Sequence, residues 1–349
     1  MANLYIGVSS KARLVKNIYI GVNGKARKVQ KAYIGVGGKA RLFYSASTPF
    51  AFTYTGSYAT EGNLEGNFVI RFKTSGTLTI GDLGNTASKI DVFMVGGGAS
   101  GGVGYAMGSS NGMGGHGGGS GYTKTVRSLS ITKGNTFKII IGAGGESAAY
   151  NTDNDASDYT PGNNGGMTSF GSYSVNGGTA ATAKNLTMAN TTASNGGSSG
   201  APSVTGSTLS QRIFTMYGGS DGGLSYSNPS EGSAAPYTGT LGKKYFGTSQ
   251  GTTTREFGEA TGKLYAGGGG AAMHLRDTFP GNGGGGQGLQ VYKGHKDTGG
   301  LIRDVTGGTI NTGSGGGGGG YFRSNPENQL IRRNSGAGGS GIVCIRNAR

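Results

Sequence analysis

Short apolar runs along the chain predict β-strands rather than helices. Runs rich in β-branched and aromatic residues occur at 67–72, 75–80, 90–95, 137–141 and 341–346, and such runs are typical of strands. No window carries an apolar stripe at a period near 3.6 that glycine does not interrupt, and each interior glycine costs a helix about 1 kcal/mol relative to alanine. The pattern therefore predicts an all-β protein.

Residues 1–44 repeat one pattern three times at a spacing of fourteen. Each copy reads Tyr-Ile-Gly-Val, then a two-residue turn, then Lys-Ala-Arg; the turns are Ser9-Ser10, Asn23-Gly24 and Gly37-Gly38. Asn-Gly and Gly-Gly supply the positive φ angles that tight hairpin turns require. The segment is therefore predicted to form three β-hairpins.

The hairpin register decides which side chains share a face. If Val22 pairs with Lys25 and Ile20 with Arg27, the apolar β-branched residues share a face with these two cations, and Tyr19, Gly21 and Ala26 lie on the other face. The small residues would then admit the tyrosine ring of a neighbouring unit. Because a short repeat cannot bury a core alone, stacking on neighbours or on other copies is expected. The predicted assembly residues are Tyr5, Tyr19, Tyr33, Lys11, Lys25, Lys39, Arg13, Arg27 and Arg41.

Positive charge is concentrated in the same segment. Residues 1–44 hold six Lys and three Arg with no Asp or Glu, which is +9 of the total +15 and leaves +6 for the other 305 residues. One interpretation is a surface for an anionic partner such as nucleic acid, a membrane or an acidic polymer. The other is a set of solvated hairpin ends that prevent edge-to-edge aggregation. The two interpretations stay open.

Glycine dominates the remainder, with 77 residues in the chain against 7 prolines. Glycine blocks alternate with strand-like runs from residue 96 onward, and 31 aromatic residues argue against a disordered linker. Polyglycine can adopt the extended helix of three residues per turn that polyproline also uses, while keeping its N–H donors for neighbouring chains. Ordering glycine is entropically costly, so every such bond must form. We therefore predict hairpin repeats over 1–44, a β-connector over 45–95 and a glycine-rich β and polyglycine-II-helix domain over 96–349.

The connecting loops, such as 147–161 and 224–240, are predicted to project from this stiff scaffold, an arrangement that suits recognition. The first glycine-rich loop supplies the candidate receptor-binding residues Tyr105, Asn111, Met113 and His116.

The hairpin array and several glycine-rich segments resemble parts of a known class of protein. The hairpin array Tyr-Ile-Gly-Val-x-Gly-Lys-Ala-Arg is similar to N-terminal segments of structural proteins from tailed bacteriophages and prophages of Gram-positive bacteria. The sequences at 90–98, 253–259, 264–270 and 338–343 resemble the glycine-rich domain of phage tail or fibre proteins. The resemblance implies a virion component, often tail-associated, with polyglycine helices in its distal domain and host-surface binding at the loops between them. It also favours a homotrimer.

Enzyme and metal motifs are weak. Gly96-x-Gly98-x-x-Gly101 follows an apolar strand, but neither the helix nor the later acidic residue of a dinucleotide site is present. An acidic cluster at 153–158 lacks the spacing of a calcium loop, and His116, His274 and His295 lie far apart without ligand partners. Cys344, the single cysteine, is expected to be a small buried residue. We predict no cofactor, no metal site and no enzymatic activity.

The expected role is a tail- or fibre-associated virion protein that binds the host cell surface and contacts other virion proteins through residues 1–44. It would be assembled in the host cytoplasm, and the chain shows neither a signal peptide nor a membrane span. Two alternatives remain: a purely structural capsid, neck or baseplate decoration protein, and a nucleic-acid-binding module that uses the +9 segment, although the chain lacks a groove-reading element.

Overall fold

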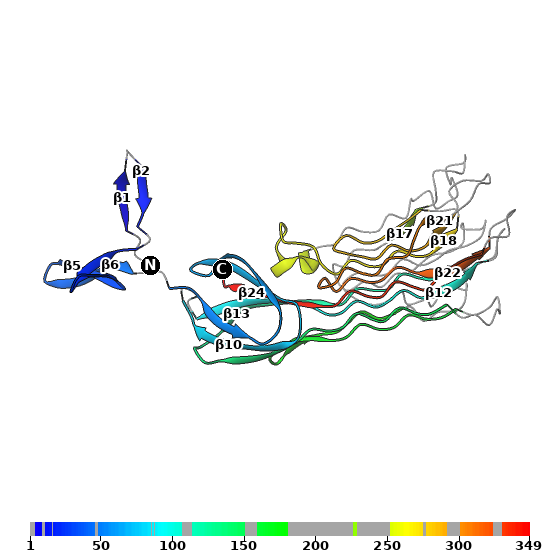
Figure 1. Ribbon diagram of the computed structural model, residues 1–349, viewed down its shortest axis with the longest axis horizontal. Coiled ribbons are helices and arrows are strands. Elements are labelled where there is room, and N and C mark those ends of the chain that lie inside the picture. The colour runs from blue at the N-terminus through cyan, green and yellow to red at the C-terminus, as the bar shows by residue number, and fades with distance from the viewer. Residues whose placement is uncertain are drawn as a thin grey trace.

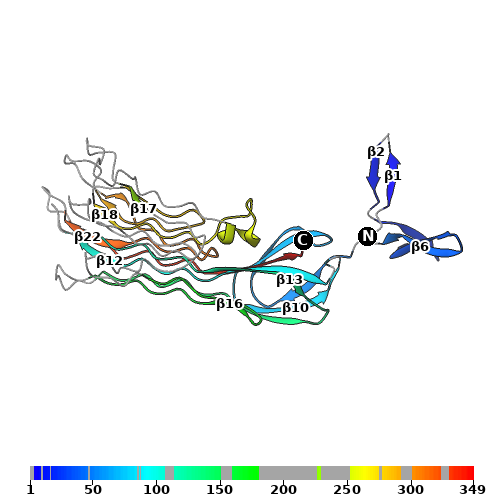
Figure 2. The same ribbon diagram turned by 180° about the vertical axis from the view of Figure 1, so that it is seen from behind.

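The protein is nearly all β, and its parts follow one another along one long axis (Figure 1). Figures 1 and 2 show the N-terminal hairpins at one end, a pair of sheets next to them, and a bundle of extended segments that runs to the far end. The computed structural model describes residues 4–8, 11–15, 17–45, 48–84, 86, 88–106, 114–150, 159–180, 226–228, 252–274, 277–291, 301–323 and 330–349.

The repeats form three antiparallel hairpins, as predicted. They pair β1 (Tyr5–Val8) with β2 (Lys11–Leu14), β3 (Tyr19–Val22) with β4 (Lys25–Lys28), and β5 (Lys31–Val36) with β6 (Lys39–Ser45). The predicted register is confirmed, because Val22 lies opposite Lys25 and Ile20 opposite Arg27. Asn23 and Gly24 take φ values of 52° and 73°, which are the positive values that the tight turn requires.

Two five-stranded antiparallel sheets pack face to face and form a β-sandwich. One has the order β16-β15-β14-β10-β7 and the other β13-β11-β24-β9-β8. The first contains β16 (Tyr173–Val175), β15 (Thr168–Phe170), β14 (Thr136–Ile140), β10 (Gly76–Asp82) and β7 (Ala51–Tyr54). The second contains β13 (Thr123–Ser130), β11 (Lys89–Val95), β24 (Ile342–Asn347), β9 (Asn67–Phe72) and β8 (Tyr58–Asn63). Half of these strands lie outside the range 45–95 assigned to the connector, so the connector and the glycine-rich domain share both sheets.

Apolar side chains from both sheets fill the space between them, among them Phe68, Ile70, Leu78, Val92 and Phe170. The opposite face of β11 is also buried, because Phe93 and Val95 pack against Phe257 and Tyr265. Burial on both faces explains why residues 90–95 are an almost continuous apolar run instead of an alternating one.

The glycine blocks form a hydrogen-bonded lattice with a period of three residues. Along 96–103, successive N–H groups donate to carbonyl groups of three different neighbouring segments in turn. Residues 96, 99 and 102 donate to residues 122, 119 and 116, and residues 97, 100 and 103 donate to residues 166, 163 and 160. Residues 98 and 101 donate to residues 339 and 336. A helix of three residues per turn presents successive donors in three directions. The predicted polyglycine helix is therefore present in the structure.

Segment 313–319 lies at the centre of the lattice. Its N–H and C=O groups bond to six surrounding segments, at 96–103, 114–122, 265–272, 284–289, 304–309 and 334–341. At its close-contact glycines the lattice leaves no room for a side chain: a Cβ on Gly98 would lie 2.0 Å from the carbonyl oxygen of Ser314. Backbone contacts thus replace a side-chain core in this part of the protein.

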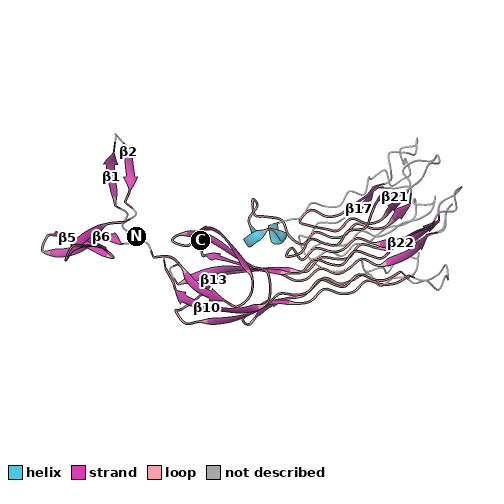
Figure 3. Cartoon of the chain, in the orientation of Figure 1, coloured by secondary structure: helices cyan, strands magenta, loops and turns pink. Residues whose placement is uncertain are grey.

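The lattice ends in short strands on the side away from the sandwich (Figure 3). There β12 (Val103–Ala106) pairs with β22 (Gly319–Arg323), which pairs with β23 (Leu330–Arg333). Similarly β18 (Met273–His274) pairs with β20 (Gln290–Val291), β20 with β21 (Leu301–Arg303), and β17 (Tyr226–Asn228) with β19 (Asp277–Phe279). Two short 3-10 helices, η3 (Thr252–Thr254) and η4 (Glu256–Gly258), lie near the start of the lattice.

Candidate assembly and binding surfaces

The three hairpins expose both of their faces. Tyr5, Tyr19 and Tyr33 are 55%, 58% and 55% exposed, and the isoleucines that follow them are exposed to a similar extent. The near-equal values show that the three repeats are equally open. An isolated two-stranded hairpin is at best marginally stable in water. The hairpins therefore present surfaces that a partner would cover.

The predicted assembly cations occupy equivalent places in the three hairpins. Lys11, Lys25 and Lys39 lie opposite the valine before each turn, and the arginines two residues later lie opposite isoleucine. The cations thus share the isoleucine face, whereas the tyrosines lie on the other face. These side chains are exposed, and their contact with a partner stays a prediction.

The four candidate receptor residues do not form one site in the described chain. Tyr105 lies in β12 opposite Tyr321 of β22, at the far end of the lattice, and Asn111 and Met113 lie outside the described residues. His116 is only 5% exposed, and its carbonyl accepts the N–H of Gly102 at 2.9 Å. Its ring packs 5.3 Å from that of Tyr159, and burial lowers the pKa of its imidazole to about 4. His116 therefore packs inside the lattice as a neutral side chain.

Aromatic stacking supports the far end of the lattice. The rings of Tyr150 and Tyr321 stack at 5.8 Å, and the guanidinium of Arg332 lies 5.3 Å and 5.5 Å from the two ring centres. The side-chain oxygen of Asn334 accepts the N–H of Tyr150 at 2.9 Å. These contacts fasten Tyr150, in the first part of the 147–161 loop, onto β22 and the end of β23. Most of that loop, and of the 224–240 loop, lies outside the described residues.

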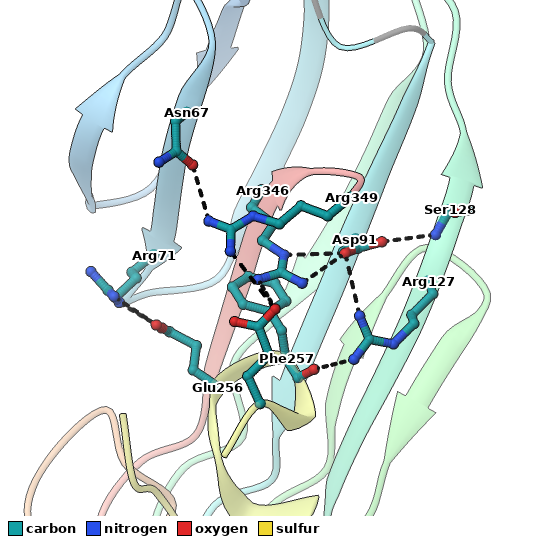
Figure 4. Close-up of polar contacts among 10 residues, drawn as sticks. Asn67, Arg71, Asp91, Arg127, Ser128, Glu256, Phe257, Arg346 and Arg349 are labelled. Carbon is teal, nitrogen blue, oxygen red and sulfur yellow. Dashed lines mark hydrogen bonds and ion pairs between the residues drawn. The ribbon is translucent and has the colours of Figure 1, made fainter. Parts of the chain in front are cut away.

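A buried ionic cluster joins the sandwich to the lattice (Figure 4). The carboxylate of Glu256 accepts hydrogen bonds from Nε and Nη2 of Arg71 at 2.7 Å each, and from the hydroxyl of Tyr265 at 2.9 Å. Burial alone would raise the pKa of Glu256, but the hydrogen bonds and charge of Arg71 outweigh it, so the pKa is lowered. The hydrogen bonds that Arg71 donates to Glu256 raise the pKa of Arg71 in turn. The pair is therefore held in its charged form.

A second ion pair lies beside the first on the same sheet. Arg346, 2% exposed on β24, contacts the carboxylate of Asp91 on β11 at 3.1 Å, and the backbone N–H of Ser128 donates to Asp91 at 2.9 Å. The Arg346 guanidinium also lies 4.3 Å from the ring centre of Phe257 and 2.7 Å from Glu259. The Arg71–Glu256 pair and the contacts of Arg346 with Phe257 and Glu259 thus bind segment 252–264 to the outer face of this sheet.

The backbone conformation of segment 252–264 directs its side chains toward the sheet. Phe257 and Gly258 have φ values of 56° and 66°. A positive φ is uncommon for a bulky residue such as Phe and indicates a tight turn that the surrounding contacts hold in place. Phe257 is 2% exposed. The Thr-Arg-Glu-Phe-Gly-Glu motif is therefore a clamp that fixes where the next lattice segment, 265–272, begins.

Sequence reasoning missed this cluster, although a signal for it was present. Asp91 and Arg346 are the single charged residues of the otherwise apolar runs 90–95 and 341–346, and buried charges are nearly always paired. Cys344, in contrast, was expected to be buried and is fully buried. Its sulfur lies 4.0 Å from the Tyr265 hydroxyl, and burial raises the pKa of its thiol well above the ordinary value.

The sequence motifs considered for nucleotide or metal binding either belong to the lattice and the strands or lie outside the described residues. Gly96, Gly98 and Gly101 belong to the lattice segment 96–103, which continues from β11 without the helix that a dinucleotide site needs. Within the described residues, no three His, Cys, Asp or Glu side chains gather as metal ligands; the acidic cluster at 153–158 and His295 lie outside them, and His274 lies in β18.

Comparison with known proteins places the chain in a family. No curated protein gives a significant match. Among the described residues, no helix has the length and apolar character needed to cross a membrane. A model of a glycine-rich domain matches residues 73–348, a range that covers most of the chain and includes the lattice, the clamp and the closing strand β24. The protein therefore belongs to this glycine-rich domain family.

Proposed function

We propose that the protein is a tail- or fibre-associated virion protein whose glycine lattice carries loops that bind the host cell surface, and whose hairpins attach it to the virion. The observation that carries the proposal is that the two ends of the molecule differ: open hairpins lie at one end, and the short strands that end the lattice lie at the other. A tail adhesin needs both an attachment end and a recognition end.

The lattice suits the recognition end physically. Consecutive backbone groups are bonded to fixed neighbours along 96–103 and 313–319, so the ends of the segments have little freedom. Binding residues on loops benefit when a rigid scaffold positions them, because less conformational entropy is lost on binding. Loops between lattice segments can then vary in sequence while the scaffold stays the same.

The hairpin end suits attachment. Exposed tyrosines lie on one face of each hairpin, and exposed β-branched and basic side chains share the other face. Interfaces between proteins are enriched in aromatic residues and Arg. The purely structural alternative uses the same attachment end and assigns no binding role to the loops.

The experiment compares the binding of labelled full-length protein to Gram-positive host cells at physiological salt. We expect saturable binding that falls at least tenfold in the double variant Asn111→Ala/Met113→Ala. The matched control, Thr132→Ala/Lys133→Ala, changes an exposed turn at the sandwich end and should bind like wild type. Absence of saturable binding by the wild-type protein would reject adhesion and favour the structural role.

A further inference from the structure

The repeated hairpin glycines have no structural reason within the described chain. Gly7, Gly21 and Gly35 lie inside strands, where glycine offers no side chain to pack and weakens the strand. None has a φ in the left-handed region, and a Cβ on any of them would meet no atom within 4 Å. The hairpins themselves would therefore accept a larger residue. Such a strand glycine commonly marks a site that another group approaches closely.

Each of these glycines shares its face with an alanine and a tyrosine. The register places Gly7 opposite Ala12, Gly21 opposite Ala26 and Gly35 opposite Ala40, and the tyrosine two residues before each glycine lies on the same side. We call this the tyrosine–glycine–alanine face. It combines a recess with an adjacent ring that is more than half exposed. A surface with a recess and a projecting ring is complementary to itself.

Charge is separated between the two faces. The lysine and arginine after each turn lie on the isoleucine face. Among the described residues, the tyrosine side carries Lys28, which lies opposite Tyr19, and Lys31, which lies two residues before Tyr33 in β5. Like charges that meet across an interface oppose association. The tyrosine–glycine–alanine face can therefore meet a second copy of this chain without bringing these six cations together, whereas the isoleucine face cannot.

We infer that the tyrosine–glycine–alanine face is a self-association surface. The tyrosine ring of a hairpin in one copy lies on the glycine–alanine pair of a hairpin in a second copy, and the reverse contact forms at the same time, as in any two-fold interface. Aromatic rings that cover glycine in this way stabilise designed sheets. The basic isoleucine face stays outward. This inference does not depend on the virion role proposed above.

Sedimentation velocity of the full-length protein over a concentration series tests the inference. We expect the wild type to self-associate and the triple variant Gly7→Val/Gly21→Val/Gly35→Val to dissociate at least tenfold more readily. Valine favours strands, and a Cβ at each of these positions meets no atom within 4 Å, so the hairpins should persist while the recess is filled. A wild-type protein that stays monomeric, or a triple variant that associates as wild type does, would overturn the inference.

Two further samples identify the contact. Tyr5→Ser/Tyr19→Ser/Tyr33→Ser, which removes the rings, should weaken association as the valine variant does. Lys11→Gln/Lys25→Gln/Lys39→Gln, on the opposite face, should associate at least as tightly as wild type. Equal weakening by the glutamine variant would place the interface on the basic face, and loss of association after nuclease treatment would show that nucleic acid bridges the copies. Either result would overturn the inference.

Discussion

Adding one methyl group at the centre of the lattice should destabilise the protein strongly. A Cβ on Gly316 would lie 2.0 Å from the carbonyl oxygen of Gly336 and 2.5 Å from that of Ala337. No flexible side chain can yield there, because both contacts are backbone. The segment must move instead, although the N–H of Gly316 donates to Ala99 at 2.9 Å and its carbonyl accepts from Gly118 at 2.8 Å.

The magnitude follows from these contacts. Overpacking a filled core costs about 1–3 kcal/mol, and each of the two lost hydrogen bonds contributes about 0.5–1.5 kcal/mol net. Gly316→Ala should therefore cost about 2–6 kcal/mol. For a domain of this size such a loss lowers the midpoint of thermal unfolding by roughly 4–24 °C.

Scanning calorimetry of the full-length protein measures the shift, with two matched controls. Gly307→Ala makes the same chemical change at an exposed lattice position where the nearest atom is 3.1 Å away, and Gly21→Ala makes it in open space. Gly21→Ala should unfold within about 2 °C of wild type, because substitutions without a named structural mechanism change stability by less than about 0.5 kcal/mol. Gly307→Ala should lower the unfolding temperature less than Gly316→Ala does, because its Cβ would meet one backbone oxygen at 3.1 Å. If Gly316→Ala unfolds at the same temperature as Gly307→Ala, the close-packed lattice is refuted.

Three further predictions concern the buried groups. Arg71→Met should cost about 3–5 kcal/mol in denaturant unfolding, because it leaves the buried carboxylate of Glu256 without its cation. Glu256→Gln should cost less, because Arg71 is only partly buried and keeps its ion pair with Glu61. The double variant should cost less than the sum, and strict additivity would contradict the pairing. Since the pKa of His116 falls from 6.5 to about 4 on folding, stability should decrease by up to about 3 kcal/mol as the pH drops from about 6.5 to about 4; His116→Phe should flatten this part of the profile, and identical pH profiles would reject the assignment. The thiol of Cys344 should resist a disulfide reagent until the protein unfolds, and rapid labelling of the native protein would show that β24 is not buried.

Local sequence patterns predicted the hairpins and the lattice well, because each depends on chemistry within one short segment. The pairs of Ile20 with Arg27 and Val22 with Lys25 follow from an Asn-Gly turn that fixes the register. The polyglycine helix follows from the absence of side chains in the glycine blocks. Neither prediction required knowledge of distant parts of the chain.

Long-range pairing could not be read from the same patterns. The insertion of β24 between β11 and β9 brings residues near 345 beside residues near 70 and 92, and no local signal specifies that neighbour. The partners of Arg71 and Asp91 were hidden for the same reason. The burial of His116 also depends on a distant segment, because Tyr159 packs on its ring, and a polar residue within a glycine-rich loop gives no sign of such packing.

Hydrogen exchange measured on the full-length protein tests most directly whether the glycine segments form an ordered lattice. All eight consecutive amides of residues 96–103 donate to backbone carbonyls, so they should be protected together, whereas amides of the open hairpins over 1–44 should exchange much faster. Protection throughout 96–103 would support a lattice that bonds every residue. Exchange of that segment as fast as the hairpins would contradict the account.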